Sequence, residues 1–157
     1  METENLEKYT RNAVRAVIIR DRKLLVQKKL DGSFTIPGGA PQADETLEQG
    51  LIRECNEEIG TQVIVKELVY VADYFKPRES TPPTIRHQIE FLFICSVDKT
   101  YKAKNGPSPD KRQVDVQWIG FDNLEQQRFV PASLIEPIKQ LNNHYDKNLP
   151  TYLGIVK

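Results

Sequence analysis

The segment from Gly38 to Thr61, which reads GGAPQADETLEQGLIRECNEEIGT, constrains the fold of this chain more than any other part of it. The two glycines follow Pro37 and permit turns that other residues resist, so we expect a strand to stop there and a loop to begin. From about Asp44 to Ile59 apolar residues recur every four positions, which predicts a helix packed on a core. Gly60 stands where a helix favours a residue able to become left-handed.

Three glutamates of this predicted helix share one patch. Glu54 and Glu58 are four residues apart and Glu54 and Glu57 are three apart, so neighbouring Cβ atoms lie about 5 to 6 Å from each other. Like charges at this separation destabilise a helix, and the single guanidinium of Arg53 cannot neutralise them all. Mg²⁺ or Mn²⁺ prefers such an oxygen environment, so the pattern predicts a metal site. On this pattern alone, a solvated acidic face paired with lysines is an equal alternative.

The helical phase places this acidic patch beside the apolar stripe and not opposite it. The patch is therefore expected at the edge of the core, in a crevice. Gly50 falls on the same side and costs the helix roughly 0.5 to 1 kcal/mol relative to alanine. A close approach by another group is the expected reason for it.

The full spacing of the segment separates these alternatives. It reads Gly39, five residues, Glu45, seven residues, Arg53-Glu54, Cys55, one residue, Glu57-Glu58, one residue, Gly60. This pattern resembles the Nudix box, the signature of hydrolases that act on nucleoside diphosphate derivatives. Its seven identities would coincide by chance with a probability on the order of one in ten million in a chain of this length.

The resemblance implies an α/β fold, an α/β/α sandwich around a central mixed β-sheet, with residues 1–157 forming a single domain. It also implies that Glu54, Glu57 and Glu58 bind the metal, and that Gly39 offers its backbone carbonyl. Glu54 would in addition orient or deprotonate the attacking water. The expected cofactor is Mg²⁺, with Mn²⁺ as the alternative.

Arg53 and Glu45 are implied to be supports of this site. Arg53 would pair with nearby acids and hold their rotamers, and Glu45 would reach back to Arg53, which is the supporting role that metal sites require. The reaction implied is substitution at phosphorus by water, which gives two phosphorylated products.

Outside the box the candidates are weaker. Glu90, in an apolar strand, and Glu79, in the loop before it, are candidate metal ligands or bases, but pairing of Glu90 with a Lys or Arg across the sheet is the simpler interpretation. Tyr74, Phe75 and Arg86 flank the same loop and are candidates to stack on a base or hold a phosphate, although such aromatic residues more often belong to the core.

The rest of the chain predicts strands, loops and one more helix. The expected strands are 14–20 and 23–29, joined in a hairpin across Asp21-Arg22, then 34–36, 62–75, 87–97 and 114–121. The expected loops are 76–86 and 98–112, and a helix is expected at 131–145, interrupted or bent at Pro137. The segment 149–157 is not assigned.

Charge and composition exclude several classes of partner. The chain has 22 basic and 22 acidic residues, so no charge excess indicates nucleic acid or a membrane surface as a partner. Its first residues are polar and no apolar segment reaches membrane-spanning length, so a cytoplasmic protein is expected. Cys55 and Cys95 lie in apolar segments without metal-site spacing and are expected to be buried, and His87 is expected to be an ordinary strand residue.

Two functional hypotheses follow from the resemblance. The first is a pyrophosphohydrolase that cleaves ADP-ribose, an oxidised nucleoside triphosphate or a nucleotide sugar. The second is a catalytically silent module that senses a nucleotide; the presence of every box carboxylate and the short chain, which leaves no room for a DNA-binding domain, count against it. The sequence identifies neither the substrate nor the oligomeric state, and the family resemblance allows a homodimer.

Overall fold

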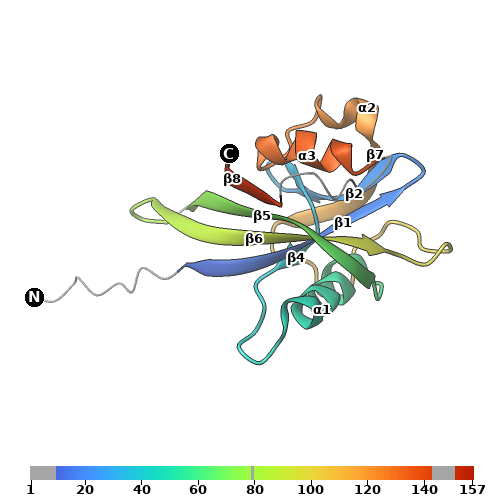
Figure 1. Ribbon diagram of the computed structural model, residues 1–157, viewed down its shortest axis with the longest axis horizontal. Helices are drawn as coiled ribbons and strands as arrows, with labels where there is room; N and C mark the ends of the chain where they lie inside the picture. Colours follow the sequence, from blue (N-terminus) through green and yellow to red (C-terminus); the bar gives the residue numbers. More distant parts are fainter. Residues whose placement is uncertain (1–9, 79, 143–150) are drawn as a thin grey trace, which may run out of the picture.

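A mixed β-sheet with helices on both faces organises the molecule. The computed structural model describes residues 10–78, 80–142 and 151–157. The strand order is β3-β2-β1-β6-β5-β8, with β4 paired to β1 and β7 paired to β2. Helix α1 covers one face, and α2 and α3 cover the other, as Figure 1 shows. The predicted α/β/α sandwich around a mixed sheet is therefore confirmed.

The first two strands form the expected hairpin. Strand β1 spans Arg11–Arg20, three residues longer than predicted, and β2 spans Lys23–Lys29 as predicted. Asp21 and Arg22 both have positive φ, 52° and 60°. A two-residue turn of this kind has a twist that matches the twist of the two antiparallel strands it joins. Most of β2 is buried, because Leu24 and Val26 pack into one apolar core and Leu25 packs into the other.

The expected loop at the two glycines is wrong in one respect. Strand β3 spans Phe34–Thr35 and stops as predicted, but Gly38–Gly39 forms strand β4, which pairs with Val14 and Arg15 of β1. Gly38 has φ 144°, and a Cβ built on it would lie 1.9 Å from the Val14 carbonyl oxygen. Only glycine lets the two backbones approach so closely.

A long hairpin follows helix α1. Strand β5 spans Ile64–Arg78 and β6 spans Thr84–Ser96, so most of the predicted loop 76–86 is strand. The prolines of this segment favoured a loop. The antiparallel pairing between the buried parts of β5 and β6 nevertheless continues into it, through the pair Pro77 and Ile85. The hairpin projects from the body of the molecule (Figure 1). Strand β6 also pairs with β1 in parallel, which makes it the centre of the sheet.

The C-terminal part differs most from the prediction. Strand β7 spans Gln113–Gly120, α2 spans Phe121–Leu124, a 3₁₀ turn spans Ala132–Leu134 and α3 spans Ile135–Gln140. Pro137 does not interrupt a helix: it lies in the first turn of α3, where its missing N–H needs no partner. Residues 143–145 of the expected helix lie outside the described residues. Strand β8, Tyr152–Val156, pairs in parallel with β5.

Helix α1 spans Leu47–Ile59 and packs on the sheet through Leu51, Cys55 and Ile59. It begins three residues later than predicted because the Thr46 hydroxyl accepts from the Gln49 N–H and the Gln49 side chain accepts from the Thr46 N–H. Gly60 ends it with φ 70°, as predicted. A Cβ on Gly50 would lie 3.1 Å from Pro41, which is the expected close approach.

Two further predictions, for the two cysteines and for the loop 98–112, are confirmed. Cys55 and Cys95 are free and buried, as predicted. The predicted loop 98–112 contains no helix or strand. Within the described ranges, no helix combines the length and the apolar character needed to cross a membrane.

The close approach at Gly38 can be tested by substitution. Gly38→Ala is expected to lower the free energy of unfolding by about 3 kcal/mol or more, because its methyl group collides with the backbone of β1. Gly32 also has positive φ, 83°, but nothing lies within 4 Å of its added Cβ. Gly32→Ala should therefore cost only the backbone term, about 1 to 2 kcal/mol. Urea unfolding of both variants measures the difference, and equal losses would contradict the close approach.

Candidate active site

The carboxylates of α1 line a hollow between the helix, β1 and the loop before β7. Its volume is about 410 Å³. The residues of α1 and β4 that line it are Gly38, Gly39, Glu54, Glu57 and Glu58. Arg11 and Arg15 of β1, Lys76 of β5 and the segment Ser108–Asp110 complete the wall. The helix periodicity thus placed the acidic patch at the edge of the core, as predicted.

Arg53 connects most of the predicted site residues. Its Nε donates to Glu45 Oε2 at 2.8 Å and its Nη2 donates to Glu45 Oε1 at 3.0 Å, a bidentate pair. Its Nη1 donates to Glu54 at 3.1 Å and to Glu57 at 3.3 Å. A further bond from Nη2 reaches the Ala40 carbonyl. The hydrogen bonds that Arg53 donates to Glu45 lower the pKa of Glu45 and raise the pKa of Arg53.

Glu58 points the other way, into the protein. It is only 4% exposed, its Oε2 accepts from Gln27 Nε2 at 2.6 Å, and its Oε1 accepts from the Gly38 N–H at 3.1 Å. Burial raises the pKa of Glu58 to about 7, the nearby Glu54 adds to the rise, and the bonds from Gln27 and Gly38 oppose it. Glu58 is therefore the carboxylate of the patch that is hardest to keep charged without a cation.

Two buried glutamines hold Glu58, and neither was predicted as a site residue from the sequence. Gln27 of β2 also donates to Gln113 Oε1 at 3.0 Å, and Gln113 of β7 donates to the Glu58 carbonyl at 2.8 Å and to Asn105 at 2.9 Å. Gln27 is 1% exposed and Gln113 is 9% exposed. A polar amide inside the apolar run LLVQ was the only available signal, since buried polar groups require partners.

Gly39 lies directly against Glu54. A Cβ on Gly39 would lie 2.7 to 2.8 Å from the carboxylate atoms of Glu54, so the absence of a side chain keeps that space open. Glu54 is 17% exposed at this point, whereas Glu57 is 41% exposed. The backbone of β4 and the Glu54 carboxylate are thus neighbours in the wall of the hollow.

The three carboxylates share the predicted patch, but they do not point in one direction. Among residues 10–78, 80–142 and 151–157, no three Asp, Glu, His or Cys side chains stand as a group ready to hold a metal ion. The cause is electrostatic: Arg53 draws Glu54 and Glu57 toward itself, while Glu58 turns inward to Gln27. Repulsion between like charges favours this division.

The residues nevertheless fit a divalent cation. Glu54, Glu57 and Glu58 line one hollow, and their hard oxygen donors are those that Mg²⁺ and Mn²⁺ prefer. The space above Gly39 that a Cβ would fill is bordered by the Glu54 carboxylate. The bonds from Arg53 to Glu54 and Glu57 are longer than those to Glu45, so a cation would compete only with the weaker contacts.

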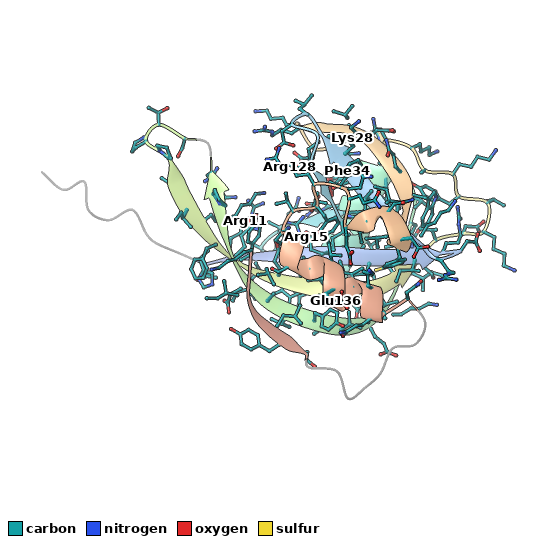
Figure 2. All side chains as sticks on the ribbon, turned by 90° about the horizontal axis from the view of Figure 1, so that it is seen from above. Arg11, Arg15, Lys28, Phe34, Arg128 and Glu136 are labelled. Carbon is teal, nitrogen blue, oxygen red and sulfur yellow. The ribbon has the colours of Figure 1, made fainter. Side chains whose placement is uncertain are left out.

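Glu90 has the simpler of its two predicted roles. Arg15 Nε donates to Glu90 Oε2 at 2.9 Å, and Gln88 donates to its other oxygen at 3.3 Å, so the 1% exposed carboxylate is paired across the sheet. Glu79 lies outside the described residues. Figure 2 shows Arg11, Arg15 and Arg128 between the tip of the β5–β6 hairpin and the strand that carries Lys28.

The weaker substrate-binding candidates divide into two groups. Tyr74 lines a second hollow that adjoins the first, as does Glu90. Phe75 and Arg86 line neither hollow. Phe75 instead stacks on His87 with ring centroids 4.4 Å apart, and His87 Nε2 lies 2.7 Å from Asp73 Oδ1. His87 is therefore a strand residue with partners, as expected.

The buried Glu58 makes the stability of the metal-free protein depend on pH. Its pKa in the folded chain, about 7, exceeds the ordinary value of 4.5, so the folded state binds the proton more tightly and loses stability as pH rises from about 4.5 to 7. Between pH 5 and pH 8, Glu58→Gln is expected to gain up to roughly 3 kcal/mol of unfolding free energy relative to wild type. Urea unfolding in chelator measures it. Glu57→Gln, which alters an exposed carboxylate, should show no such gain, and an equal gain there would contradict the assignment.

Comparison with known proteins agrees with this geometry. The NUDIX domain family matches residues 9–140. An ADP-ribose pyrophosphatase of Methanocaldococcus jannaschii is 35% identical over 91 residues, which are 54% of this chain and 50% of that protein. A MutT-like protein of Streptomyces ambofaciens is 39% identical over 61 residues, 38% of this chain and 40% of that one. The matches thus span about half or less of the length of these relatives.

Solved structures share the fold. A NUDIX hydrolase from Nitrosomonas europaea superposes with a TM-score of 0.68 at 22% identity, covering 92% of this chain and 77% of that one. An ADP-ribose pyrophosphatase from Streptococcus suis superposes with a TM-score of 0.64 at 18% identity, covering 90% and 97%. These likenesses concern the fold alone, and the family match extends over most of the chain. The chain therefore belongs to the NUDIX domain family.

Proposed function

We propose that this protein hydrolyses a diphosphate bond in a small nucleoside diphosphate derivative, in the class of ADP-ribose, a nucleoside triphosphate or a nucleotide sugar, with Mg²⁺ as its cofactor. One observation carries the proposal: Glu54, Glu57 and Glu58 line the same hollow as the backbone of Gly38 and Gly39. The name of the Methanocaldococcus jannaschii relative supports the substrate class. We further propose that the chain forms one domain, because both apolar cores pack on the same sheet.

The residues of the hollow would divide the work. Glu54, Glu57, Glu58 and the Gly39 carbonyl would hold the cation, and Nudix hydrolases generally use divalent metals. When bound, Mg²⁺ lowers the pKa of a coordinated water and stabilises negative charge on diphosphate oxygens. Mn²⁺ has similar ligand preferences and is the alternative.

Glu54 would orient the attacking water and accept its proton. The water oxygen forms a bond to phosphorus, the bridging P–O bond breaks, and the leaving phosphate keeps the bonding electrons, so two phosphorylated products result. Glu45 and Arg53 would act by position: their bidentate pair fixes the guanidinium, which in turn restrains Glu54 and Glu57.

Cations at the rim suit an anionic substrate. Arg15, Arg11 and Lys76 line the hollow opposite the glutamates. Arg15 uses its Nε and Nη2 on Glu90, and no bond of its Nη1 is found among the described residues. That nitrogen is therefore available to a diphosphate oxygen.

The proposed activity is tested with a panel of substrates. Purified protein is incubated with ADP-ribose, nucleoside triphosphates and nucleotide sugars with Mg²⁺, and products are separated by chromatography. We expect turnover of at least one compound and a loss on the order of 10²-fold or more in kcat for Glu57→Gln. Glu48→Gln, which changes an exposed glutamate on the same helix, should retain the rate. Nucleotide binding without turnover under any divalent metal would instead indicate the sensing module.

The role of Glu54 has its own test. Glu54→Gln is expected to lower kcat by roughly 10²- to 10⁴-fold, the range for loss of a general base. Full activity of this variant would reject Glu54 as the base and return Glu90 and Glu79 to consideration.

A further inference from the structure

A second, wider hollow continues the cleft away from the carboxylates. Its volume is about 530 Å³, and four residues, Arg15, Gly38, Lys76 and Asp110, line both hollows. The two are therefore parts of one cleft with Arg15 at their junction. The carboxylates of α1 line only the first part.

Positive charge exceeds negative charge in this second part. Its cationic residues are Arg15, Lys29, Lys76, Arg78, Arg112 and Arg128, and its carboxylates are Asp31, Glu90 and Asp110. Some of these cations are paired with carboxylates. Arg15 is paired with Glu90 and Lys29 with Asp110. Arg128 lies 3.8 Å from Asp31, and this exposed contact is weak.

Lys76 and Arg78 also line this hollow, and neither is in ion-pair contact with a carboxylate of the described residues. They are two residues apart on β5, so their side chains leave the same face of the strand as Tyr74. The side chain of neither residue donates a hydrogen bond to another residue within the described ranges, although both backbones pair with β6. Partial burial in the cleft lowers the pKa of Lys76, and the neighbouring charges of Arg15, Lys29 and Arg11 lower it further, while the charge of Glu90 opposes the fall. An anion between these groups would relieve that repulsion.

Apolar residues also line the hollow. They are Ile36, Tyr74, Pro77, Val130, Pro131 and Leu134. Tyr74 is 8% exposed and Leu134 is 2% exposed, so both belong to the core and present fixed surfaces. A ligand for this hollow therefore combines an apolar body with an anionic group, which is the composition of a nucleoside phosphate.

We propose that the second hollow binds an additional phosphate of the substrate, one that is not cleaved, with Lys76 and Arg78 as its principal cations. The inference rests on the proposed function and narrows its substrate class to nucleoside diphosphate derivatives that carry a further phosphate on the nucleoside. Arg15, at the junction, then separates the scissile diphosphate from the retained phosphate. A basic face that is merely solvated is the competing interpretation.

Binding in the absence of metal isolates this site from catalysis. Adenosine 5′-monophosphate, adenosine 2′,5′-bisphosphate and adenosine 3′,5′-bisphosphate contain no diphosphate bond, so their binding to the wild-type chain in chelator is independent of hydrolysis. Isothermal titration calorimetry at physiological ionic strength is expected to show at least one bisphosphate binding about tenfold or more tightly than the monophosphate. The two bisphosphates distinguish the position of the added phosphate.

Charge-matched variants locate the preference. Lys76→Gln combined with Arg78→Gln is expected to bring the bisphosphate affinity down to that of the monophosphate. Lys66→Gln combined with Lys139→Gln also removes two positive charges but changes residues that line neither hollow, and it should keep the preference. Far-ultraviolet circular dichroism and the urea midpoint confirm that both double variants fold.

A second measurement connects the site to turnover. ADP-ribose is compared, with Mg²⁺, with its derivative phosphorylated at the adenosine position that the two bisphosphates select, 2′ or 3′. The two compounds are expected to differ in KM by about tenfold in favour of the phosphorylated one, and the Lys76 and Arg78 double variant should abolish that ratio.

Three outcomes would overturn the inference: equal binding of the three nucleotides, no binding of any, or a preference that survives the Lys76 and Arg78 double variant. Failure of the proposed function is a separate result, because tight bisphosphate binding without turnover of any diphosphate would leave the phosphate site standing and reject hydrolysis.

Discussion

The approach of the Gly38–Gly39 backbone to β1 and α1 is the constraint on which the rest of the site depends. Gly38 lies so close to Val14 that a methyl group would overlap the carbonyl, and its N–H donates to Glu58. Gly39 leaves the space in front of the Glu54 carboxylate open. A side chain at Gly38 would separate β4 from the sheet, and a side chain at Gly39 would displace the Glu54 carboxylate. Two residues without side chains therefore join strand, loop and helix around the hollow.

Charge is distributed so that the glutamates of α1 coexist without a cation. Arg53, which Glu45 holds in place, donates hydrogen bonds to Glu54 and Glu57. Burial favours the neutral form of Glu58, and two glutamines hold this residue. A divalent ion would replace the weaker contacts of Arg53 and favour the charged form of Glu58. The cleft then has an acidic end and a basic end, which suits a ligand whose phosphates bind both a cation and cationic side chains.

The features that the sequence predicted correctly depend on short-range geometry. The phase of α1 and the left-handed Gly60 follow from residue spacing within a few turns, and so does the edge position of the acidic patch. Features that depend on tertiary pairing were missed. Gly38–Gly39 became a strand because β1 lies beside it, and the β5–β6 hairpin continued through Pro77 because its register was already set. Gln27 and Gln113 reach Glu58 from β2 and β7, distant parts of the chain that no local pattern connects.

The most direct test of this account locates the cation itself. Crystals of the full chain soaked in Mn²⁺ give an anomalous difference map that shows manganese without reference to activity. A peak is expected in the hollow beside Gly39, in contact with at least two of Glu54, Glu57 and Glu58, together with weaker contacts from Arg53 to Glu54 and Glu57. Manganese bound only elsewhere, or no peak at saturating Mn²⁺, would contradict it.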